Sequence, residues 1–322
     1  MKKLNTKPRV DLYEKITSEI IGYLSAGVRP WVKSWKCGTQ RLPLRATGEP
    51  YRGINVLILW GAQIECGYRC NTWMTYRQAV AVGANVRKGE KGQLVVYSAK
   101  FEKEDAERET RAVSFLRQYV VFNFEQIENL PDDYAVRIPS GVEEGKASEG
   151  EAMTPNDADA VLIATGATIN HGGGQPYYAP GPDAVQMPDF DTFRDADAYT
   201  ATLAHELVHW TGAAHRLDRK FDSLRLKEDT AREELVAEIG AAFVCAQLGV
   251  AAKEREDHAR YIDHWLTLLK GDKKAVVKAA ALAQKAADYM LAEAACEEDT
   301  GPQADAGDAV ALRETVAAGG EA

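Results

Sequence analysis

The sequence predicts an α+β protein of two domains, the first with antiparallel strands and the second mostly helical with a small sheet. Charge divides the chain, because residues 1–130 contain 21 Lys and Arg against 13 Asp and Glu, whereas residues 131–322 contain 18 against 35. Strand-like stretches alternate with helical ones in the basic half, while long helical patterns fill most of the acidic half. A stretch rich in Pro, Gly and acidic residues separates the two halves.

The basic half is expected to begin with a helix over residues 11–26. Apolar side chains recur there at helical spacing, between Asp11, which is suited to cap a helix, and Gly27, which is suited to end one. Further helices are expected near residues 54–66 and 75–82. Strands are expected over residues 94–101 and 113–124, on either side of a charged run that is typical of a solvated hairpin tip.

Domain boundaries follow from these changes in pattern. We assign residues 1–130 to the first domain, 131–155 to a linker, 156–295 to the second domain and 296–322 to an acidic tail that is expected to be disordered. Within the second domain we expect a short helix over 157–165, short strands between 177 and 187, and long helices over 196–212, 231–248 and 254–295, the last broken at Gly271.

Composition excludes several classes of protein. No stretch approaches the roughly 18 uninterrupted apolar residues that a membrane helix requires. The five cysteines are odd in number and scattered, which argues against a disulfide framework. The N-terminal residues carry positive charge without a following apolar segment, so we expect no secretory signal and a cytoplasmic, bacterial location.

The most informative segment is His205-Glu206-Leu-Val-His209, on a predicted amphipathic helix. Two histidines four residues apart lie on one helix face, where their rings can bind one zinc ion. Glu206 is placed to take a proton from a water molecule that the metal activates. The sequence therefore predicts one divalent ion per chain, zinc or another ion such as Mn or Co. Two surface histidines on a helix are the alternative.

A third ligand is expected from the following helix, where Glu234 and Glu238 lie one turn apart on one face. One would bind the metal and the other would accept a hydrogen bond from a ligand histidine. Glu238 is favoured as the ligand because it lies deeper in the apolar part of the helix, although the reverse assignment stays open. Both could also be solvated surface carboxylates.

Other polar side chains of this half are candidates for the substrate side of such a site. His171 and Tyr178 flank a glycine-rich loop, and either could stabilise an oxyanion. His215 follows a glycine that should end the helix, so we expect it to support the site or face the substrate. Residues 184–188 resemble the edge strand with which zinc peptidases bind an extended substrate.

The basic half intersperses aromatic residues with cations, a combination suited to single-stranded nucleic acid, whose bases stack on aromatic rings. No double-strand recognition motif is evident. The alternative is that most of these aromatic residues belong to the core. The candidate contacts are Trp31, Lys33, Trp35, Arg52, Trp73, Tyr76, Arg77, Arg87, Lys88 and Lys91, and the same pattern continues to Tyr97 and Tyr119.

Both halves resemble one known family, the ArdC-type antirestriction proteins of conjugative plasmids and phages. The matching strings extend over most of the chain outside the tail. They include residues 11–13, 27–35, 50–55, 73–79, 86–92, 119–123, 186–188, 205–212 and 233–238.

The resemblance implies a single-stranded-DNA-binding domain joined to a zincin-like metallopeptidase domain of the gluzincin type. It also implies protection of incoming plasmid DNA from host restriction during conjugation. Two alternatives stay open: a regulatory metalloprotease that cleaves a DNA-associated repressor, and a DNA-binding accessory protein with a structural metal site. Single-stranded DNA is the expected partner, with an unidentified protein substrate as a second one and no membrane.

Overall fold

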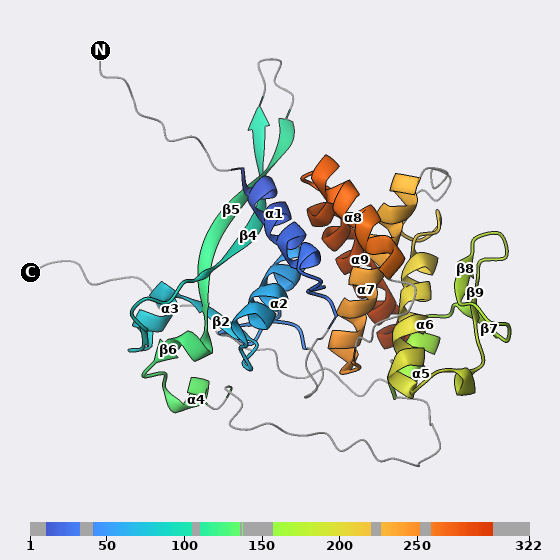
Figure 1. Ribbon diagram of the computed structural model, residues 1–322, viewed down its shortest axis with the longest axis horizontal. Coiled ribbons are helices and arrows are strands. Elements are labelled where there is room, and N and C mark those ends of the chain that lie inside the picture. The colour runs from blue at the N-terminus through green and yellow to red at the C-terminus, as the bar shows by residue number, and fades with distance from the viewer. Residues whose placement is uncertain are drawn as a thin grey trace, which may run out of the picture.

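The chain forms an α+β structure in which a helical layer lies between a long hairpin and a small sheet (Figure 1). The computed structural model describes residues 11–32, 41–104, 110–135, 137, 157–219, 227–251 and 259–298. We refer to residues 11–137 as the first half and to residues 157–298 as the second half. The expected fold class is confirmed.

The first half begins with helix α1 (Leu12–Ser25), which the sequence predicts almost to the residue. The Asp11 carboxylate accepts hydrogen bonds from the backbone N–H groups of Tyr13 and Glu14 and so caps the first turn. Gly27 follows the helix with a positive φ of 75°, a conformation that favours glycine. Two further expected helices are also present, α2 (Ile54–Cys66) and the short α3 (Tyr76–Ala81).

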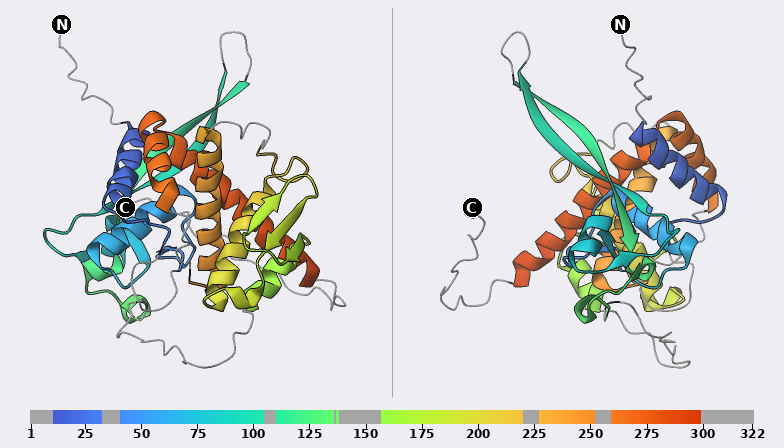
Figure 2. Two further views of the ribbon diagram at one scale, coloured as in Figure 1. Left: turned by 45° about the vertical axis from the view of Figure 1, so that its right-hand side comes forward. Right: turned by 90° about the vertical axis from the view of Figure 1, so that its left-hand side faces the viewer.

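A four-stranded sheet of order β1-β2-β5-β4 forms the other layer of this half. Its strands are β1 (Leu44–Arg45), β2 (Thr72–Thr75), β4 (Gln93–Glu104) and β5 (Thr110–Asn123). The expected antiparallel hairpin is confirmed by the pairing of β4 with β5. It projects beyond the helices (Figure 2), and the expected tip falls largely in residues 105–109, which lie outside the described residues.

Helix α2 protects the outer edge of this sheet. The Asn55 side chain donates to the carbonyl oxygen of Val96 at 2.7 Å and accepts from the Val96 N–H at 2.8 Å. Both groups lie on β4, which is the end strand of the sheet, and an unprotected edge would be open to pairing with another chain. A second, two-stranded sheet pairs β3 (Asn85–Val86) with β6 (Ile127–Glu128), followed by the short helix α4 (Asp132–Ala135) inside the expected linker. The rest of that linker, apart from Pro131 and Arg137, lies outside the described residues, as do residues 299–322 of the expected tail.

The second half consists of helices packed against a small sheet. The helices are α5 (Asp157–Ile163), α6 (Ala196–Thr211), α7 (Lys227–Leu248), α8 (Ala259–Gly271) and α9 (Ala275–Glu298). Helix α7 lies against both α6 and α9. The buried face of α9 consists largely of small side chains, which allow close approach: Ala279, Ala280, Ala283, Ala286 and Ala287.

The small sheet has the strand order β7-β9-β8 and lies beside α6 (Figure 1). Its strands are β7 (Thr168–His171), β8 (Tyr177–Ala179) and β9 (Ala184–Met187). The expectation of an edge strand over residues 184–188 is wrong, because β9 is the central strand, paired in parallel with β7 and antiparallel with β8. Strand β7, which the sequence did not predict, occupies one edge.

One hydrophobic core joins the two halves. Trp31, from the segment after α1, lies edge-on to Trp265 of α8 with ring centroids 5.7 Å apart. The Thr17 hydroxyl donates to the Lys273 carbonyl oxygen at 2.7 Å, and Figure 2 shows α1 beside α8. Among the described residues, no helix combines the length and apolar character that crossing a bilayer requires.

The Trp31 contact gives a prediction for stability. Trp31 is 1% exposed, so Trp31→Ala should lower the free energy of unfolding by about 3–5 kcal/mol, through reduced burial and a residual cavity. Urea denaturation followed by circular dichroism measures this change. Tyr97→Ala is the control, because Tyr97 is 58% exposed and should change stability by less than about 0.5 kcal/mol. Equal stability of the two variants would contradict the shared core.

Candidate metal centre and nucleic-acid surface

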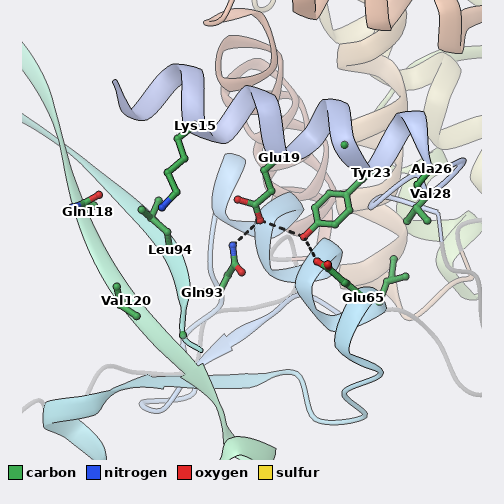
Figure 3. A pocket seen from close by; sticks show the side chains of 13 residues that line it. Lys15, Glu19, Tyr23, Ala26, Val28, Glu65, Gln93, Leu94, Gln118 and Val120 are labelled. Carbon is green, nitrogen blue, oxygen red and sulfur yellow. Dashed lines mark hydrogen bonds between the residues drawn. The ribbon is translucent and has the colours of Figure 1, made fainter. Parts of the chain in front are cut away.

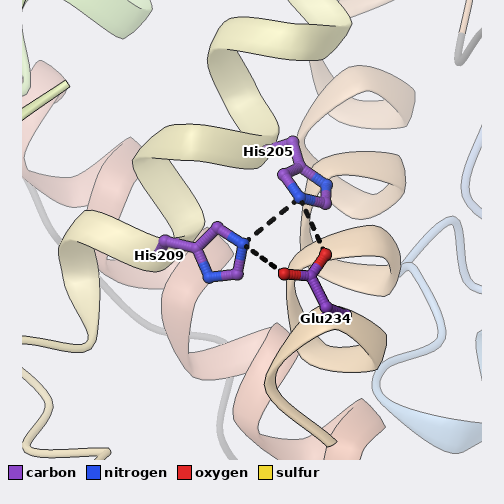
Figure 4. A group of neighbouring side chains, drawn as sticks. All are labelled: His205, His209 and Glu234. Carbon is purple, nitrogen blue, oxygen red and sulfur yellow. Dashed lines mark hydrogen bonds and ion pairs between the residues drawn. The ribbon is translucent and has the colours of Figure 1, made fainter. Parts of the chain in front are cut away.

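Three side chains from α6 and α7 converge in the second half (Figure 4). The Nε2 atoms of His205 and His209 lie 3.2 Å apart. The Glu234 carboxylate faces both rings: its Oε2 atom lies 3.6 Å from Nε2 of His205, and its Oε1 atom lies 3.6 Å from Nε2 of His209. One donor atom from each residue lies within 4.8 Å of the other two. Two imidazoles and a carboxylate are a donor set that divalent zinc, manganese or cobalt accepts, so these residues could hold a metal ion.

Close packing of the two helices brings these donors together. On α6, His205 and His209 lie one turn apart and point toward α7. On α7, Gly240 sits against Val208, and a Cβ atom at residue 240 would lie 2.8 Å from a Val208 methyl group. Glycine is therefore required at that contact. The α6 segment from Tyr199 to Thr211 is buried on all sides, so the expected amphipathic pattern understates how deeply this helix lies in the core.

The two carboxylates of α7 face different sides of the histidine rings. Glu234, and not the favoured Glu238, faces the Nε2 atoms of both histidines. Glu238 lies on the far side of the His205 ring, with its Oε1 atom 3.1 Å from Nδ1. Depth in the apolar part of the helix was the basis for favouring Glu238. Glu238 is indeed the more buried, but burial there suits a group that supports the ring.

His209 has a corresponding partner that the sequence reasoning missed. Its Nδ1 atom lies 3.2 Å from Glu233 Oε1. Glu233 also accepts hydrogen bonds from the Arg219 guanidinium at 2.8 and 3.1 Å. Burial raises the pKa of Glu233, but the hydrogen bonds with His209 and Arg219 outweigh it, so the pKa is lowered. The only signal in the sequence was that Glu233 opens one of the strings shared with the ArdC-type family.

Burial and charge act on Glu234 in a similar way. Burial raises its pKa, whereas a hydrogen bond with His205 and the nearby imidazoles lower it by a larger amount, so that the pKa falls below its usual range. Glu234 is therefore a carboxylate near neutral pH. Glu206 follows His205 on α6 and is 3% exposed, which excludes bulk water from its surroundings.

The candidates on the substrate side belong to two separate clusters. His171 Nε2 lies 2.8 Å from the hydroxyl of Tyr199, and the two rings stack. Tyr199 is on α6, seven residues before Glu206, so both lie on one helix face.

The second cluster surrounds Asp183. Its carboxylate accepts hydrogen bonds from the Tyr178 hydroxyl at 2.8 Å and from Arg216, and His215 Nε2 lies 3.3 Å away. The Arg216 hydrogen bond lowers the pKa of Asp183 to about 2, while burial raises the pKa of Tyr178 to about 12. Arg216 also stacks on Trp210, 3.9 Å from the ring centroid. Tyr178 and His215 are therefore part of a contact that holds the loop after α6 against the small sheet.

In the first half, two of the candidate DNA contacts are core residues. Trp31 and Trp73 are each 1% exposed, so neither ring has a face open to a nucleobase in this structure. Trp73 lies edge-on to Tyr68 with ring centroids 5.8 Å apart. These two assignments are corrected here, because tertiary packing covers the rings. Lys33 and Trp35 lie outside the described residues.

The remaining candidates lie at the surface, and two of them are paired with carboxylates. Arg52 forms an ion pair with Asp288 of α9, and Arg87 forms one with Glu90 at 2.8 Å. Tyr76 is 55% exposed. Arg77, Lys88 and Lys91 are also exposed, and Lys88 and Lys91 lie in the turn that leads into β4.

An exposed aromatic surface lies on the β4–β5 hairpin. In the strand register, Tyr97 is opposite Arg117, and Tyr119 is opposite Val95. Because paired residues and alternate residues of a strand share a face, the side chains of Tyr97, Arg117 and Tyr119 lie on one face. Tyr97 is 58% exposed and Tyr119 is 47% exposed. Two exposed rings beside a guanidinium are suited to stacking on unpaired bases.

A pocket of about 640 Å³ lies between α1, α2 and the start of the hairpin (Figure 3). The Tyr23 hydroxyl lies 3.3 Å from both Glu19 and Glu65. Its single proton can be donated to only one of them at a time. Gln93 donates to Glu19 at 2.7 Å, and burial raises the pKa of Glu19. The pocket is lined by these two carboxylates together with Lys15 and Gln93.

Comparison with known proteins finds a matching family model for each half. Residues 10–122 match the family model described as the N-terminal domain of anti-restriction factor ArdC. Residues 156–282 match a zincin-like metallopeptidase model. The chain therefore joins two recognised units, and the second of them is of the class to which HExxH peptidases belong.

Solved structures and other known proteins are similar to this chain over most of its length. The chain resembles the crystal structure of the antirestriction ArdC protein from the R388 plasmid, metal-free (43% identity, TM-score 0.76) and Mn(II)-bound (42%, 0.74); each match covers 89% of this chain and 99% of that one. It is 39% identical to the uncharacterized protein y4eC of Sinorhizobium fredii, over 88% of this chain and 92% of that protein. The chain belongs to the ArdC family of antirestriction proteins.

Longer relatives contain a similar region. Two proteins of Escherichia coli, each named DNA primase TraC, are 36% identical to this chain over 89% and 87% of its length. The match covers 20% of one primase and 27% of the other. This chain therefore corresponds to about a quarter or less of those proteins.

Proposed function

We propose that the protein binds single-stranded DNA through its first half, holds a divalent metal in a peptidase-like site in its second half, and protects incoming plasmid DNA from host restriction. Membership of the ArdC family supports the protective role. The observation that carries the metal site is the convergence of two imidazoles and a carboxylate, with a second carboxylate at each Nδ1 atom.

The chain's own residues define what this site can do. His205, His209 and Glu234 would hold the ion, zinc or another divalent metal, at one per chain. A divalent ion supplies Lewis-acid activation of water. Glu206, adjacent in sequence to a ligand and shielded from solvent, is placed to accept a proton and to pass it to a leaving amine. Glu233 faces the Nδ1 atom of His209 and Glu238 faces that of His205, where a carboxylate can orient the ligand ring. An unidentified protein is the proposed substrate.

The proposed metal site predicts different effects for the substitution of a metal ligand and for the substitution of the proposed base. His205→Ala should abolish stoichiometric binding of Mn²⁺ or Zn²⁺, because two remaining donors cannot hold the ion at neutral pH. Glu206→Gln should keep the ion and lose any peptide hydrolysis. Elemental analysis and isothermal titration calorimetry measure the first effect. His215→Ala is the control, and it should bind the ion as the wild type does. A wild-type chain that binds no ion after reconstitution would refute the site.

The single-strand proposal is supported by the exposed face of Tyr97, Arg117 and Tyr119. Lys88 and Lys91 precede this face by a few residues of the chain, and each residue of a β-strand adds about 3.3 Å. The two lysines are therefore placed to contact the phosphates of a DNA strand whose bases stack on the face. Tyr76 and Arg77 begin α3 immediately after β2, which pairs with β5 at Thr75 and Val121. This arrangement brings aromatic rings and cations to the same end of the hairpin.

Stacking predicts a measurable fall in affinity. In the full chain, Tyr97→Ala or Tyr119→Ala should weaken binding of an oligo(dT) strand by about 5- to 150-fold, the equivalent of 1–3 kcal/mol for one stacked base. Tyr97→Phe should retain most affinity, since the ring remains. Tyr177→Ala is the matched control, because Tyr177 is 52% exposed in the second half. Fluorescence anisotropy measures these affinities, and equal binding of duplex DNA would contradict the stacking model.

Neutralisation of phosphates by the two lysines predicts a change in salt dependence. Lys88→Ala with Lys91→Ala should lower the slope of log affinity against log salt by about 0.7 for each phosphate that the variant no longer neutralises, because fewer condensed counterions are released on binding. Oligo(dT) affinities measured over a series of salt concentrations give this slope. A slope equal to that of the wild type would show that neither lysine meets the backbone.

The protective role makes a prediction in cells. Incoming plasmid enters as a single strand, whereas restriction enzymes cut duplex DNA, so a protein bound to the strand acts when the complement is first made. We expect Glu206→Ala to retain much of the protection and the Lys88→Ala, Lys91→Ala variant to lose it. Plasmid establishment in restricting and non-restricting recipients measures both. Loss of protection in Glu206→Ala with intact DNA binding would instead favour a regulatory metalloprotease.

A further inference from the structure

The segment after α6 turns back on the end of that helix. The Leu217 N–H donates to the Thr211 carbonyl oxygen at 3.0 Å, and the Arg219 N–H donates to the Gly212 carbonyl oxygen at 2.9 Å. Asp218 has a positive φ of 46°, a conformation that is uncommon outside glycine but more frequent for aspartate than for most residues. The backbone at Arg219 therefore lies against the end of α6.

The Arg219 guanidinium contacts both helices of the metal site. It donates to the two carboxylate oxygens of Glu233, on α7, at 2.8 and 3.1 Å. It also donates to the Thr211 hydroxyl at 2.8 Å and to the Val208 carbonyl oxygen, both on α6. That carbonyl is among the last four of the helix, which have no partner within it. Because the Arg219 side chain is 2% exposed, this bridge between α6 and α7 is shielded from water.

Glu233 connects this arginine to a ligand histidine. Its Oε1 atom lies 3.2 Å from His209 Nδ1 and also accepts a hydrogen bond from Arg219. On the other side of the ring, His209 Nε2 lies 3.6 Å from the Glu234 carboxylate. An imidazole ring is rigid, so a group that fixes Nδ1 also fixes the direction of Nε2. A guanidinium that meets both oxygens of a carboxylate fixes the orientation of that carboxylate in turn.

We infer that Arg219 is a positioning residue of the metal site: its guanidinium holds the Glu233 carboxylate against His209 Nδ1 and so directs Nε2 toward the other two donors. The inference rests on the proposed metal site. It gives the segment after α6 a part in metal binding, although none of the three proposed ligands lies in that segment.

Arg216, from the same segment, makes contacts of the same kind away from the ligands. Its Nε atom donates to the Trp210 carbonyl oxygen at the end of α6 at 2.7 Å, and its guanidinium donates to the Asp183 carboxylate at 3.0 Å. The Arg216 side chain is 5% exposed. Asp183 precedes β9 in the small sheet and is no ligand of the proposed site. Both arginines are thus buried cations at one helix end, but Arg219 alone of the two faces a carboxylate that meets a ligand ring.

A double-mutant cycle in the full-length chain tests the inferred role. The variants are Arg219→Met, Glu233→Gln and the two combined, and the measurement is Mn²⁺ and Zn²⁺ affinity by competition with a fluorescent chelator. Arg219→Met should weaken binding by about 10- to 100-fold, as removal of a group behind a metal ligand does. In the Glu233→Gln background, the same change should cause no further weakening, because Arg219 acts through that carboxylate.

Two further variants separate positioning from charge and from stability. Arg219→Lys keeps the positive charge but lacks the planar fork that meets both Glu233 oxygens, so its metal affinity should fall between those of the wild type and Arg219→Met. Arg216→Met is the matched control. It should lower the midpoint of urea denaturation, as Arg219→Met does, because each variant removes a buried cation from the same helix end. The folded Arg216→Met chain should nevertheless bind metal as the wild type does.

Several results would overturn the inference. Wild-type metal affinity in a folded Arg219→Met or Arg219→Lys chain would do so. Tighter binding by Arg219→Met would do so as well, since loss of a mere counter-charge would leave the Glu233 anion to attract the metal cation. An equal fall in affinity in the Glu233→Gln and wild-type backgrounds, or in Arg216→Met, would show a general structural role instead.

The design also covers failure of a variant to fold and failure of the metal site. If Arg219→Met does not fold, Arg219→Lys replaces it in the cycle under the same criteria. Absence of metal binding by both the wild type and Arg216→Met would refute the metal site itself. Failure of the positioning role and failure of the proposed site are thus distinguishable.

Discussion

Burial of charged and ionisable groups between α6 and α7 is the constraint on which the second half depends. His205, Glu206, His209, Glu233 and Glu238 are each no more than 9% exposed. An isolated charge in such surroundings would cost several kcal/mol, so each must face a partner of opposite sign or a metal ion. That requirement fixes the register of the two helices, and Gly240 and the small side chains of α9 allow the packing that keeps it.

Local patterns were sufficient for much of the fold and for the core of the site. The Asp11 cap and the apolar spacing after it define α1, and the spacing of His205 and His209 on one helix places the metal donors. The choice between Glu234 and Glu238 needed the structure, because both lie one turn apart on the same face and only the approach of α6 shows which one reaches the Nε2 atoms. Arg219 reaches Glu233 from the segment after α6, and no local spacing in the sequence reports that contact.

The aromatic residues of the first half show a different limit. A tryptophan beside a lysine has the same composition whether its ring stacks on a base or packs in a core. Trp31 and Trp73 are covered by tertiary contacts, whereas the smaller Tyr97 and Tyr119 stay exposed because they lie on the projecting hairpin. Strand β7 was missed for a related reason: it is short, mostly exposed, and paired with the central strand β9 instead of with a neighbour in sequence.

The contact between Trp31 and Trp265 also bears on how such chains recombine. In the two TraC primases, a region similar to this chain spans both halves together within a much longer protein. A crossover between the halves would separate one indole from the other and leave apolar surface on both products. Selection would then favour inheritance of the two halves together as one unit. The same contact makes the peptidase-like half a poor candidate for inheritance on its own.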